Sequence, residues 1–519
     1  MRIALVQMQA NDIRDFQVAV DKLLNMTCEA AKKNDLVIVP ECAFPAYYIE
    51  PREINLSLVL GKTQYFLEKM KEIAKKNHSY IAFGYVEKDN DRLYNTALLI
   101  DREGKEVVKK HKSYLWHFDH LWFSEGEDLA TADTDFGKVA LIICCDARSP
   151  EIVRMAALAG ADLIIDLANL TATGPNISEL QNAQSAYLLS VRAMENGVWI
   201  AMADKWGVET HNITYAGRSA VYNPEGNCLY QAGSDADEIV SVEIPAGKDG
   251  RILRENNTAL PVRRPDLYEL LAAPTDELPV KKVIEQPVCI SEITPYITAV
   301  TGELSAQDYV AMVQRLGVHG SRLICMPPSR LAIKELQREL CAVMASEVMV
   351  VATMIEGETT KSYILQKEGI VADYENAHKN GGKPFVLAAS WGNVGLLHEE
   401  EGLIPEWARC IMLAGADCLL WPNRLPSSVV TPVARTRAAE NRMFVVVVQS
   451  ETSSALGQII DPNGIVLAST LENQTQQACG TYACFANSRM KNIVPGTHVI
   501  YNRHPQAYKR LVRGTEKAD

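Results

Sequence analysis

Three side chains in the first half of the chain could do chemistry, and each stands at the end of a predicted strand or shortly after one. Glu41 follows the apolar run 36–40, Cys144 follows the apolar run 141–143, and Lys112 ends a basic cluster. A carboxylate can serve as a general base, a cysteine as a nucleophile and a lysine as a stabiliser of negative charge. A buried strand would give such side chains a rigid support.

Each of these residues also has an ordinary interpretation. A glutamate behind a proline could be solvated, and most basic clusters are solvated faces. Cys144 and Cys145 could be two buried structural thiols. Segment 144–151 is more informative, because a strand ends there and a helix begins near Pro150. A cysteine at such a junction lies near helix amides, which favour the thiolate.

The elements that must position these residues alternate in type along the first 270 residues. Short apolar runs with strand-like composition are separated by amphipathic segments, which is the pattern of an α/β layered fold. In segment 16–31 the apolar residues recur at helical spacing, so one face of a helix there is apolar. Strands are predicted at 3–8, 36–39, 80–85, 96–100, 139–143, 163–166, 198–203 and 219–222.

The second half of the chain repeats the first. Pro150-Glu151 and Pro405-Glu406 are 255 positions apart, and each precedes a helix that ends in Leu-Ala-Gly-Ala-Asp. Matching motifs in the same order indicate a tandem duplication of a whole domain. Segment 271–286 has two prolines, mixed charges and no periodicity, which is typical of a linker. We therefore expect a first domain at 1–273, a linker at 274–286 and a second domain at 287–519.

The composition is that of a globular chain. Of 519 residues, 47% are hydrophobic and 22% charged, and this length favours two domains. The formal net charge of -12 argues against a nucleic-acid or anionic-membrane surface, because both need a basic footprint. No apolar stretch suits a membrane span or a signal peptide. Twelve cysteines suggest reduced thiols and a cytoplasmic protein, since many lie inside apolar runs: Cys289, Cys325, Cys410 and Cys418.

Taken together, the three reactive segments resemble the nitrilase superfamily of carbon-nitrogen hydrolases, whose Glu-Lys-Cys triad lies at strand ends of an α-β-β-α sandwich. Val-Pro-Glu41 is similar to the family's glutamate motif, and His-Lys112-Ser-Tyr-Leu is similar to Arg-Lys-x-x-Leu. Residues 144–151 are similar to Cys-Tyr-Asp-x-Arg-Phe-Pro-Glu, and this register makes Cys144 the nucleophile. The resemblance implies an α/β fold of two tandem nitrilase-like sandwiches, packed as an intramolecular pseudo-dimer.

The resemblance also implies a role for each residue of the site. Glu41 would take the proton of Cys144, whose thiolate would attack a carbonyl carbon. Lys112 and the backbone N–H of Cys145 would stabilise the oxyanion. Asp119 stands, one methylene shorter, where family members often carry a second glutamate beside the lysine.

The chemistry implied by the resemblance requires neither a metal nor another cofactor. Three histidines lie close to Lys112 in sequence, and such a group could suggest a metal site. No cysteine or carboxylate partner stands at ligand spacing from them, so a metal is not expected. The three are His111, His117 and His120.

The residues after the nucleophile bear on the substrate. They resemble the amidase and carbamoylase branches, because nitrile-hydrolysing members typically have Trp-Glu after the cysteine. Arg148 could hold a substrate carboxylate or form an intramolecular salt bridge, and Tyr47 and Trp116 could be pocket walls or core aromatics. We expect hydrolysis of a small amide or N-carbamoyl compound. The alternatives are a nitrilase, an acyltransferase, or a non-catalytic binding or assembly protein.

The second half has lost all three reactive residues in this comparison. Pro328 replaces the glutamate, Glu399 stands 255 positions beyond Cys144, and Asn376 or Ala377 takes the place of the lysine. This half is therefore not expected to hydrolyse anything. It could pack as a tethered partner, with a homo-oligomer formed through the fused pair, or it could bind an effector.

Overall fold

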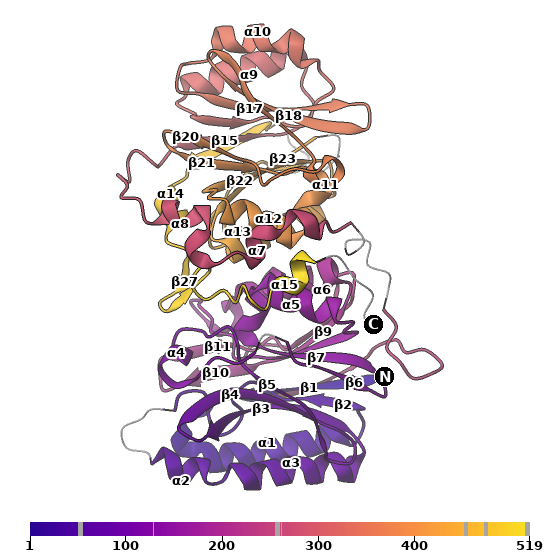
Figure 1. The fold of residues 1–519 in the computed structure, drawn as a ribbon. Helices are drawn as coiled ribbons and strands as arrows, with labels where there is room; N and C mark the ends of the chain where they lie inside the picture. The colour runs from indigo at the N-terminus through magenta and orange to yellow at the C-terminus, as the bar shows by residue number, and fades with distance from the viewer. Residues whose placement is uncertain are drawn as a thin grey trace. The chain divides into compact units, whose positions relative to one another are not determined.

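The computed structural model describes residues 1–49, 55–127, 129–254, 260, 262–450, 455–471 and 476–513. The chain divides into two compact units, Met1–Pro261 and Val262–Asp519. Each unit contains two β-sheets with helices on their outer faces (Figure 1). The expected α/β fold of two α-β-β-α sandwiches is confirmed. The packing of the two sandwiches against each other stays a prediction.

The first sheet of unit 1 carries the segments that lead to Glu41 and Lys112. Its strands lie in the order β11-β10-β1-β2-β3-β4-β5, and β14 also pairs with β1. The β1-β2-β3 pairs are parallel and the β3-β4-β5 pairs antiparallel. The strands are β1 (Arg2–Gln9), β2 (Leu36–Ile38), β3 (Tyr80–Asp89), β4 (Arg92–Ile100), β5 (Glu106–His111), β10 (Lys205–Glu209), β11 (Ile213–Ala216) and β14 (Glu238–Glu243).

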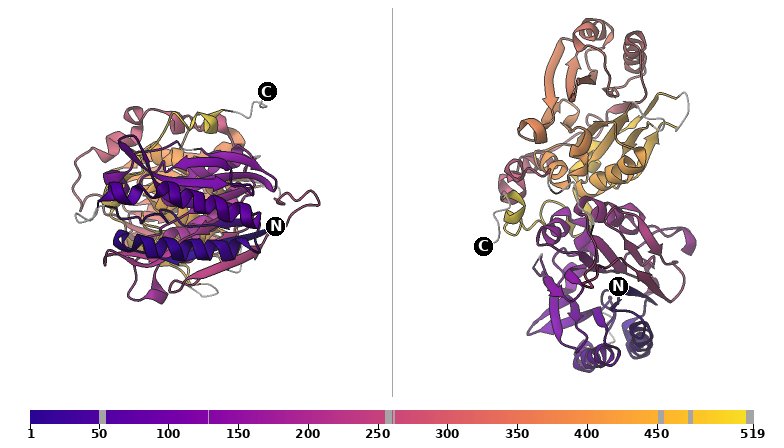
Figure 2. Two further views of the ribbon diagram at one scale, coloured as in Figure 1. Left: turned by 90° about the horizontal axis from the view of Figure 1, so that it is seen from below. Right: turned by 90° about the vertical axis from the view of Figure 1, so that its right-hand side faces the viewer.

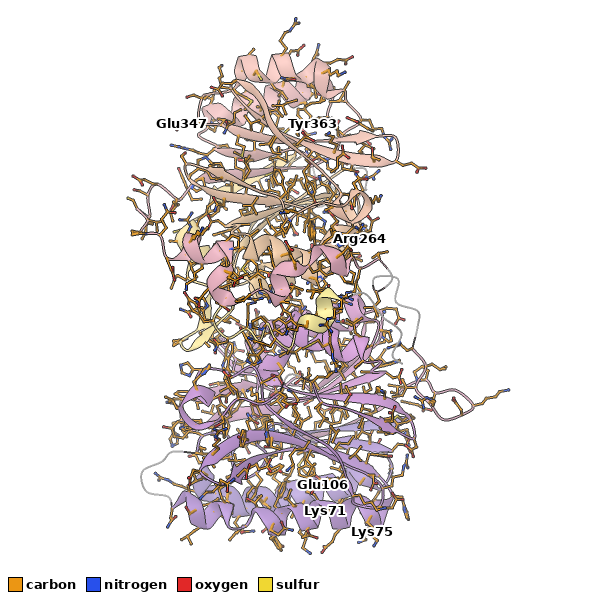
Figure 3. All side chains as sticks on the ribbon, in the orientation of Figure 1. Lys71, Lys75, Glu106, Arg264, Glu347 and Tyr363 are labelled. Atoms are coloured by element: carbon orange, nitrogen blue, oxygen red, sulfur yellow. The ribbon has the colours of Figure 1, made fainter. Side chains whose placement is uncertain are left out.

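Two long helices, α1 (Phe16–Ala31) and α3 (Thr63–Asn77), lie side by side over this sheet (Figure 2). The predicted apolar face of α1 is buried, and Leu23 packs with Phe66 of α3 and Phe83 of β3 in one core cluster. Burying a side chain of this size stabilises the fold by about 1.5–3 kcal/mol. Lys71 of α3 also pairs with Glu106 of β5, at 3.4 Å between Nζ and Oε1 (Figure 3).

The second sheet of unit 1 leads to Cys144. Its strands β7, β8 and β9 face β4, β3 and β2 of the first sheet, and helices α5 (Pro150–Leu158) and α6 (Leu189–Asn196) accompany it. All the predicted strands are confirmed, with end points that differ by a few residues. The sheet order is β13-β12-β9-β8-β7-β6, formed by β6 (Thr131–Thr134), β7 (Gly137–Ile143), β8 (Leu163–Leu167), β9 (Trp199–Ala203), β12 (Ala220–Tyr222) and β13 (Cys228–Gln231).

Unit 2 repeats this topology. Its sheets have the orders β19-β18-β17-β16-β15-β26 and β20-β21-β22-β23-β24-β25, which match β5-β4-β3-β2-β1-β14 and β6-β7-β8-β9-β12-β13 of unit 1. Its longer helices are α9 (Ala306–Val318), α10 (Ile333–Val343), α12 (Pro405–Leu413) and α13 (Ser427–Asn441). The strands are β15 (Tyr296–Val300), β16 (Leu323–Cys325), β17 (Met349–Glu356), β18 (Thr359–Gln366), β19 (Gly369–Glu375), β20 (Val386–Ala389), β21 (Gly392–Leu396), β22 (Cys418–Asn423), β23 (Phe444–Gln449), β24 (Gly457–Ile460), β25 (Val466–Ser469) and β26 (Ala478–Tyr482).

The division between the units comes earlier in the chain than the predicted boundary at 273. The predicted linker, 274–286, contains a short 3-10 helix (Thr275–Glu277) and α8 (Pro279–Ile284) within unit 2. Leu278 and Val280 are buried, and α8 packs on α12. The segment differs from a linker because its apolar side chains, spaced between prolines and charges, have a helix to pack against.

Two further sequence expectations concern the cysteines and the membrane. None of the twelve cysteines, all of which lie among the described residues, forms a disulfide bond, and Cys325, Cys410 and Cys418 are buried as expected. The expectation was wrong for Cys289, which is exposed because the apolar residues around it do not form a core strand. Among the described residues, no helix has both the length and the apolar character needed to cross a bilayer.

Candidate active site

The backbone that carries Glu41 lies directly on strand β3. Past the end of β2, the amide of Gly84 donates to the carbonyl of Pro40 at 3.2 Å, and the amide of Ala43 donates to the carbonyl of Gly84 at 3.0 Å. A Cβ atom at position 84 would lie 2.7 Å from the Cα of Glu41, so only glycine allows this approach. The glutamate therefore has a fixed place at the strand end, and its side chain is buried.

One carboxylate oxygen of Glu41 is held by two donors. Its Oε1 accepts a hydrogen bond from Nδ2 of Asn95 at 2.6 Å and another from Nζ of Lys112 at 2.7 Å. Among the described residues, its Oε2 has no hydrogen-bond partner. The two oxygens are therefore distinct, and Oε2 is the one that can exchange a proton with a neighbour.

Lys112 is held between two carboxylates. Its Nζ lies 2.7 Å from Oε1 of Glu41 and 2.7 Å from Oδ2 of Asp119, and all three side chains are buried. Oδ2 of Asp119 also accepts from the amide of Trp116 at 2.9 Å, at the start of α4 (Asp119–Trp122). The amide of Lys112 donates to the carbonyl of Asn95 at 2.9 Å. Asp119 thus reaches Lys112, although its side chain is one methylene shorter than the glutamate that family members often carry at this place.

Cys144 begins a 3-10 turn (Cys144–Arg148) directly after β7, with a left-handed φ of 48°. Its amide donates to Oδ1 of Asp166 at 2.9 Å, and its carbonyl accepts from Nε2 of Gln184 at 2.9 Å. Its Sγ lies 3.7 Å from the carbonyl oxygen of Asn169. A positive φ is strained for a residue with a Cβ, and such strain concentrates at functional sites. The side chains of Asp166 and Gln184 hold the turn in that conformation.

The electrostatics of the site favour a neutral thiol beside a basic carboxylate. Burial raises the pKa of Glu41, an effect that the charge of Lys112 opposes. Burial would lower the pKa of Lys112, but Asp119 and Glu41 together raise it well above its usual value. Burial and the nearby charge of Glu41 raise the pKa of Cys144 well above that of a free thiol. Burial thus acts against the thiolate that nearby helix amides were expected to favour.

The predicted substrate-contact residues lie around the same centre. The guanidinium of Arg148 lies 4.8 Å from the ring centroid of Trp116, and its Nε donates to Oε1 of Gln184 at 3.0 Å. No carboxylate pairs with Arg148 among the described residues. Tyr47 is buried, and its pKa is raised by burial and by the charges of Asp119 and Glu41, so it faces the carboxylates. Cys145 is also buried beside Cys144.

Asp166 and three further residues of the site were missed by the sequence reasoning. Asn95 holds Glu41, Gln184 holds both the Cys144 carbonyl and Arg148, and Asn169 faces the Cys144 sulfur with its carbonyl. The side-chain amide of Asn169 is buried with no hydrogen-bond partner for its oxygen or its nitrogen among the described residues. A buried amide of this kind is expected to bind water or a polar ligand.

Unit 2 has different residues at the three equivalent places. Pro328 stands three residues past β16, as Glu41 stands past β2, in sheets of the same register. Asn376 directly follows β19, as Lys112 follows β5, which decides between Asn376 and Ala377. Glu399 has a φ of 47°, so it keeps the backbone turn of Cys144.

The side chain of Glu399 is neutralised within unit 2. Its Oε1 lies 2.8 Å from Nε of Arg424, and its Oε2 accepts from the Arg424 amide at 2.9 Å. The remaining cavity is small, at about 60 Å³, and Thr360 and Asn376 are among its lining residues. The ion pair between Glu399 and Arg424 borders this cavity.

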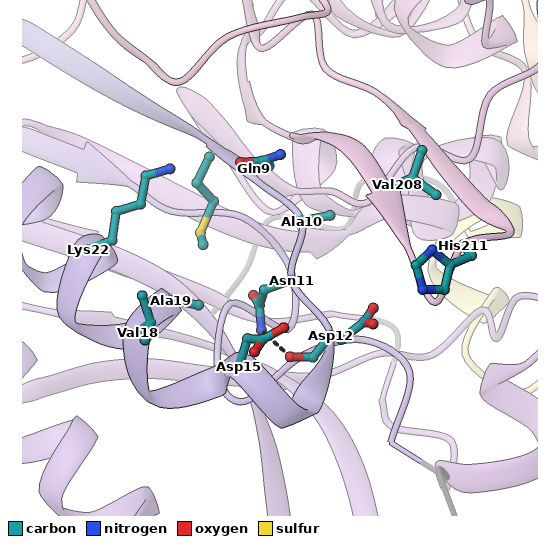
Figure 4. Close-up of a pocket in the computed structure, with 11 residues that line it drawn as sticks. Gln9, Ala10, Asn11, Asp12, Asp15, Val18, Ala19, Lys22, Val208 and His211 are labelled. Atoms are coloured by element: carbon teal, nitrogen blue, oxygen red, sulfur yellow. Dashed lines mark hydrogen bonds between the residues drawn. The ribbon is translucent and has the colours of Figure 1, made fainter.

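Other cavities lie away from the triad. The groove in Figure 4 has a volume of about 370 Å³ and lies between the end of β1, the start of α1 and the β10–β11 hairpin. Its polar side chains include Asp12, Asp15, Lys22 and His211, and none of the predicted catalytic residues lines it. The predicted site is instead closely packed around buried polar atoms.

The first half of the chain is similar to known proteins. A family model described as carbon-nitrogen hydrolase matches residues 2–249. Omega-amidase NIT2 of Bos taurus is 31% identical over 284 residues, which cover 52% of this chain and 98% of that protein. A nitrilase of Pyrococcus abyssi is 31% identical over 250 residues, covering 47% of this chain and 89% of that protein. A crystal structure of an amidase from Nesterenkonia sp. is 24% identical with a TM-score of 0.44, and it covers 52% of this chain and 95% of that chain.

Proposed function

This chain belongs to the carbon-nitrogen hydrolase family of the nitrilase superfamily, and we propose that unit 1 hydrolyses the C–N bond of a small amide or N-carbamoyl compound through a thioester on Cys144. The observation that carries the proposal is the buried chain of contacts from Asp119 through Lys112 to Glu41, near Cys144, whose thiol pKa is raised by burial. Glu41 has one oxygen fixed by donors and the other without a partner among the described residues.

The first half of the reaction forms the thioester. Oε2 of Glu41 takes the thiol proton of Cys144 while the sulfur attacks the carbonyl carbon, so the carbonyl π electrons move to oxygen. The ammonium of Lys112 stabilises this oxyanion, together with the backbone N–H of Cys145. When the intermediate collapses, the C–N bond breaks and the nitrogen takes the proton from Glu41, which releases ammonia or an amine.

The second half of the reaction returns the enzyme to its starting state. Glu41 takes a proton from water, whose oxygen attacks the thioester carbon and forms a second oxyanion beside Lys112. Collapse of this intermediate breaks the C–S bond and releases the carboxylic or carbamic acid. The thiolate of Cys144 then recovers its proton from Glu41. Every proton in this cycle is carried by a residue of the site.

Two side chains support a substrate that carries both a carboxylate and a carboxamide. Arg148 is paired with no carboxylate among the described residues, and its guanidinium lies over the ring of Trp116, where it could make a bidentate contact with a substrate carboxylate. Asn169 offers a buried donor and acceptor beside Cys144, which would match the donor and acceptor of a carboxamide. One relative is named an omega-amidase and another an (R)-stereoselective amidase.

We also propose that the two units arose by tandem duplication and that unit 2 is catalytically silent. The matching sheet orders support the first statement. The replacement of the triad by Pro328, Asn376 and Glu399, with Arg424 neutralising the last, supports the second. Unit 2 has no thiol at the position of Cys144, and Pro328 at the position of Glu41 can neither accept nor donate the proton.

Ammonia release from a panel of ω-amides of dicarboxylates, N-carbamoyl amino acids and matched nitriles tests the proposal. We expect release from an amide or carbamoyl compound, loss of that release in Cys144→Ala, and retention in Cys145→Ala. Release from nitriles alone would assign the nitrilase alternative, and transfer to added hydroxylamine in preference to water would assign the acyltransferase. No release from any compound, with no alkylation of Cys144, would favour the non-catalytic protein.

The carboxylate contact has its own test. Arg148→Gln should raise KM about 10–100-fold for an ω-amide that carries a carboxylate, since a hydrogen bond to a charged group is worth about 1.5–3 kcal/mol. The matched control is the same compound with the carboxylate replaced by a methyl group, for which the variant should behave as wild type. Equal effects on the two compounds would reject this contact.

A further inference from the structure

The two units differ in one connection of the same topology. Between β9 and β12 the chain of unit 1 runs through 204–219, which form the β10–β11 hairpin, whereas β23 and β24 of unit 2 are joined by 450–456, nine residues fewer. The hairpin extends the first sheet, because β10 pairs in parallel with β1 (Figure 1). In this connection, the unit with the triad therefore has nine more residues than the unit without it, and they include the β10–β11 hairpin.

Two buried charged residues of the hairpin point at the segment that follows Glu41. Nζ of Lys205 donates to the carbonyl of Cys42 at 2.9 Å. Oε1 of Glu209 accepts from the amide of Tyr48 at 2.7 Å, and its Oε2 accepts from the hydroxyl of Tyr215 at 2.7 Å. Lys205 and Glu209 are both fully buried. Burying a charge is costly, so a buried charge that contacts one segment is expected to fix it.

The same segment is held from its other side by strand β3. Gly84 makes backbone hydrogen bonds to Pro40 and Ala43, on either side of Glu41 and Cys42. Cys42 has a left-handed φ of 42°, a conformation that a residue with a Cβ keeps only under restraint. The restraint comes from Gly84 on one side and from Lys205 on the other.

We propose that the β10–β11 hairpin is a clamp for the catalytic base, with Lys205 and Glu209 as positioning residues that fix the 42–48 segment and thereby the carboxylate of Glu41. This inference rests on the proposed function, because it assigns the hairpin to the same reaction. Glu209 is also linked, through Tyr215, to the predicted pocket-wall residue Tyr47. The ring of Tyr215, whose hydroxyl donates to Glu209, lies edge-on to Tyr47 at 6.5 Å between centroids.

Variants of Glu209 separate positioning from folding. Glu209→Ala removes both acceptors and should lower kcat about 10–100-fold with KM within about threefold of wild type, since a misplacement near 1 Å can cost about 100-fold. Glu209→Gln keeps an acceptor for the Tyr48 amide and should restore kcat to within about threefold. Tyr215→Phe removes one of the two bonds and should give a smaller fall in the same direction. Val208→Ala, on the exposed side of the hairpin, is the matched control.

A second readout does not depend on amide turnover. The rate of Cys144 alkylation by iodoacetamide, followed by peptide mass spectrometry, reports whether Glu41 can take the thiol proton, and it should fall in Glu209→Ala and recover in Glu209→Gln. Thermal melting identifies the variants that fold. If Glu209→Ala does not fold, Tyr215→Phe is used as the test variant in its place. If the wild-type protein turns over no amide, the proposed function is rejected. The alkylation rates of Cys144 would still test the clamp proposal in that case. If Glu209→Ala folds and keeps the wild-type kcat and alkylation rate, the clamp proposal is overturned. If Glu209→Ala does not fold, wild-type values in Tyr215→Phe overturn it instead. The proposal is also overturned if kcat and the alkylation rate of Glu209→Gln are as low as those of Glu209→Ala.

Discussion

The Glu41→Gln substitution separates the chemical role of this residue from its structural one. The glutamine side chain would keep an Oε1 that accepts from Asn95 and Lys112, at the places where the glutamate oxygen lies 2.6 and 2.7 Å from those donors. It would place an amide nitrogen where Oε2 of Glu41 has no partner among the described residues. The variant therefore preserves the hydrogen bonds of the site and removes only the group that takes the thiol proton.

The expected loss is large in rate and small in stability. General base catalysis contributes about 10²–10⁴-fold, so kcat/KM should fall about 1,000-fold, equivalent to about 4 kcal/mol of transition-state stabilisation. Lys112 keeps its second carboxylate, Asp119, at 2.7 Å, so no buried cation is left unpaired. The melting temperature should stay within about 4 °C of wild type, since about 1 kcal/mol shifts a large domain by about 2–4 °C.

The assay is ammonia release under kcat/KM conditions, with circular dichroism melting on the same samples. Asn95→Ala is the matched control, because it removes one donor to Glu41 but leaves the base. It should lose less activity than Glu41→Gln. A Glu41→Gln enzyme that retains more than a tenth of wild-type kcat/KM would refute the role of Glu41 as the base. A large fall in melting temperature would refute the argument that Asp119 keeps the lysine paired.

Three further predictions follow from the same geometry. Lys112→Met leaves Glu41 and Asp119 buried without their cation, so it should cost about 3–5 kcal/mol of stability in chemical denaturation and about 10²–10³-fold in kcat; a variant as stable as wild type would contradict the buried pairing. Gly84→Ala places a Cβ 2.7 Å from the Cα of Glu41 and should lower kcat about 100-fold with little change in KM, whereas wild-type kinetics would show that β3 can give way. Because burial raises the pKa of Glu41 and the base must be ionised, kcat/KM should fall as pH drops through a value above the ordinary carboxyl pKa of about 4.3, and an acid limb below that value would contradict the direction of the shift.

Much of the site could be predicted because its residues are coupled to local sequence signals. Glu41 and Cys144 stand at the ends of short apolar strands, and the continuous apolar runs that locate those strands are local signals. Asp119 was located by the resemblance to family members that carry a second glutamate beside the lysine, and it does contact Lys112. The repeat at 255 positions located Glu399, whose turn matches that of Cys144.

The remainder depends on contacts that no local pattern encodes. Asn95 reaches Glu41 from the middle of β4, and Glu209 reaches Tyr48 from a distant part of the chain, so only the folded sheet brings them together. The protonation of Cys144 depends on how completely its surroundings exclude water, which a helix start in the sequence does not reveal. The unit boundary was placed too late because Leu278 and Val280 are buried where α8 packs on α12, a helix far along the chain.

The most direct test of the central claim is to trap the acyl-enzyme and locate it. Wild-type protein is mixed with a turned-over amide, quenched in acid within one turnover, and measured by intact and peptide mass spectrometry. A thioester on Cys144 is predicted, with a mass increase equal to the acyl group. It should be absent in Cys144→Ala and present in Cys145→Ala. An adduct on Cys145, or turnover of the amide with no adduct on any cysteine, would contradict the account.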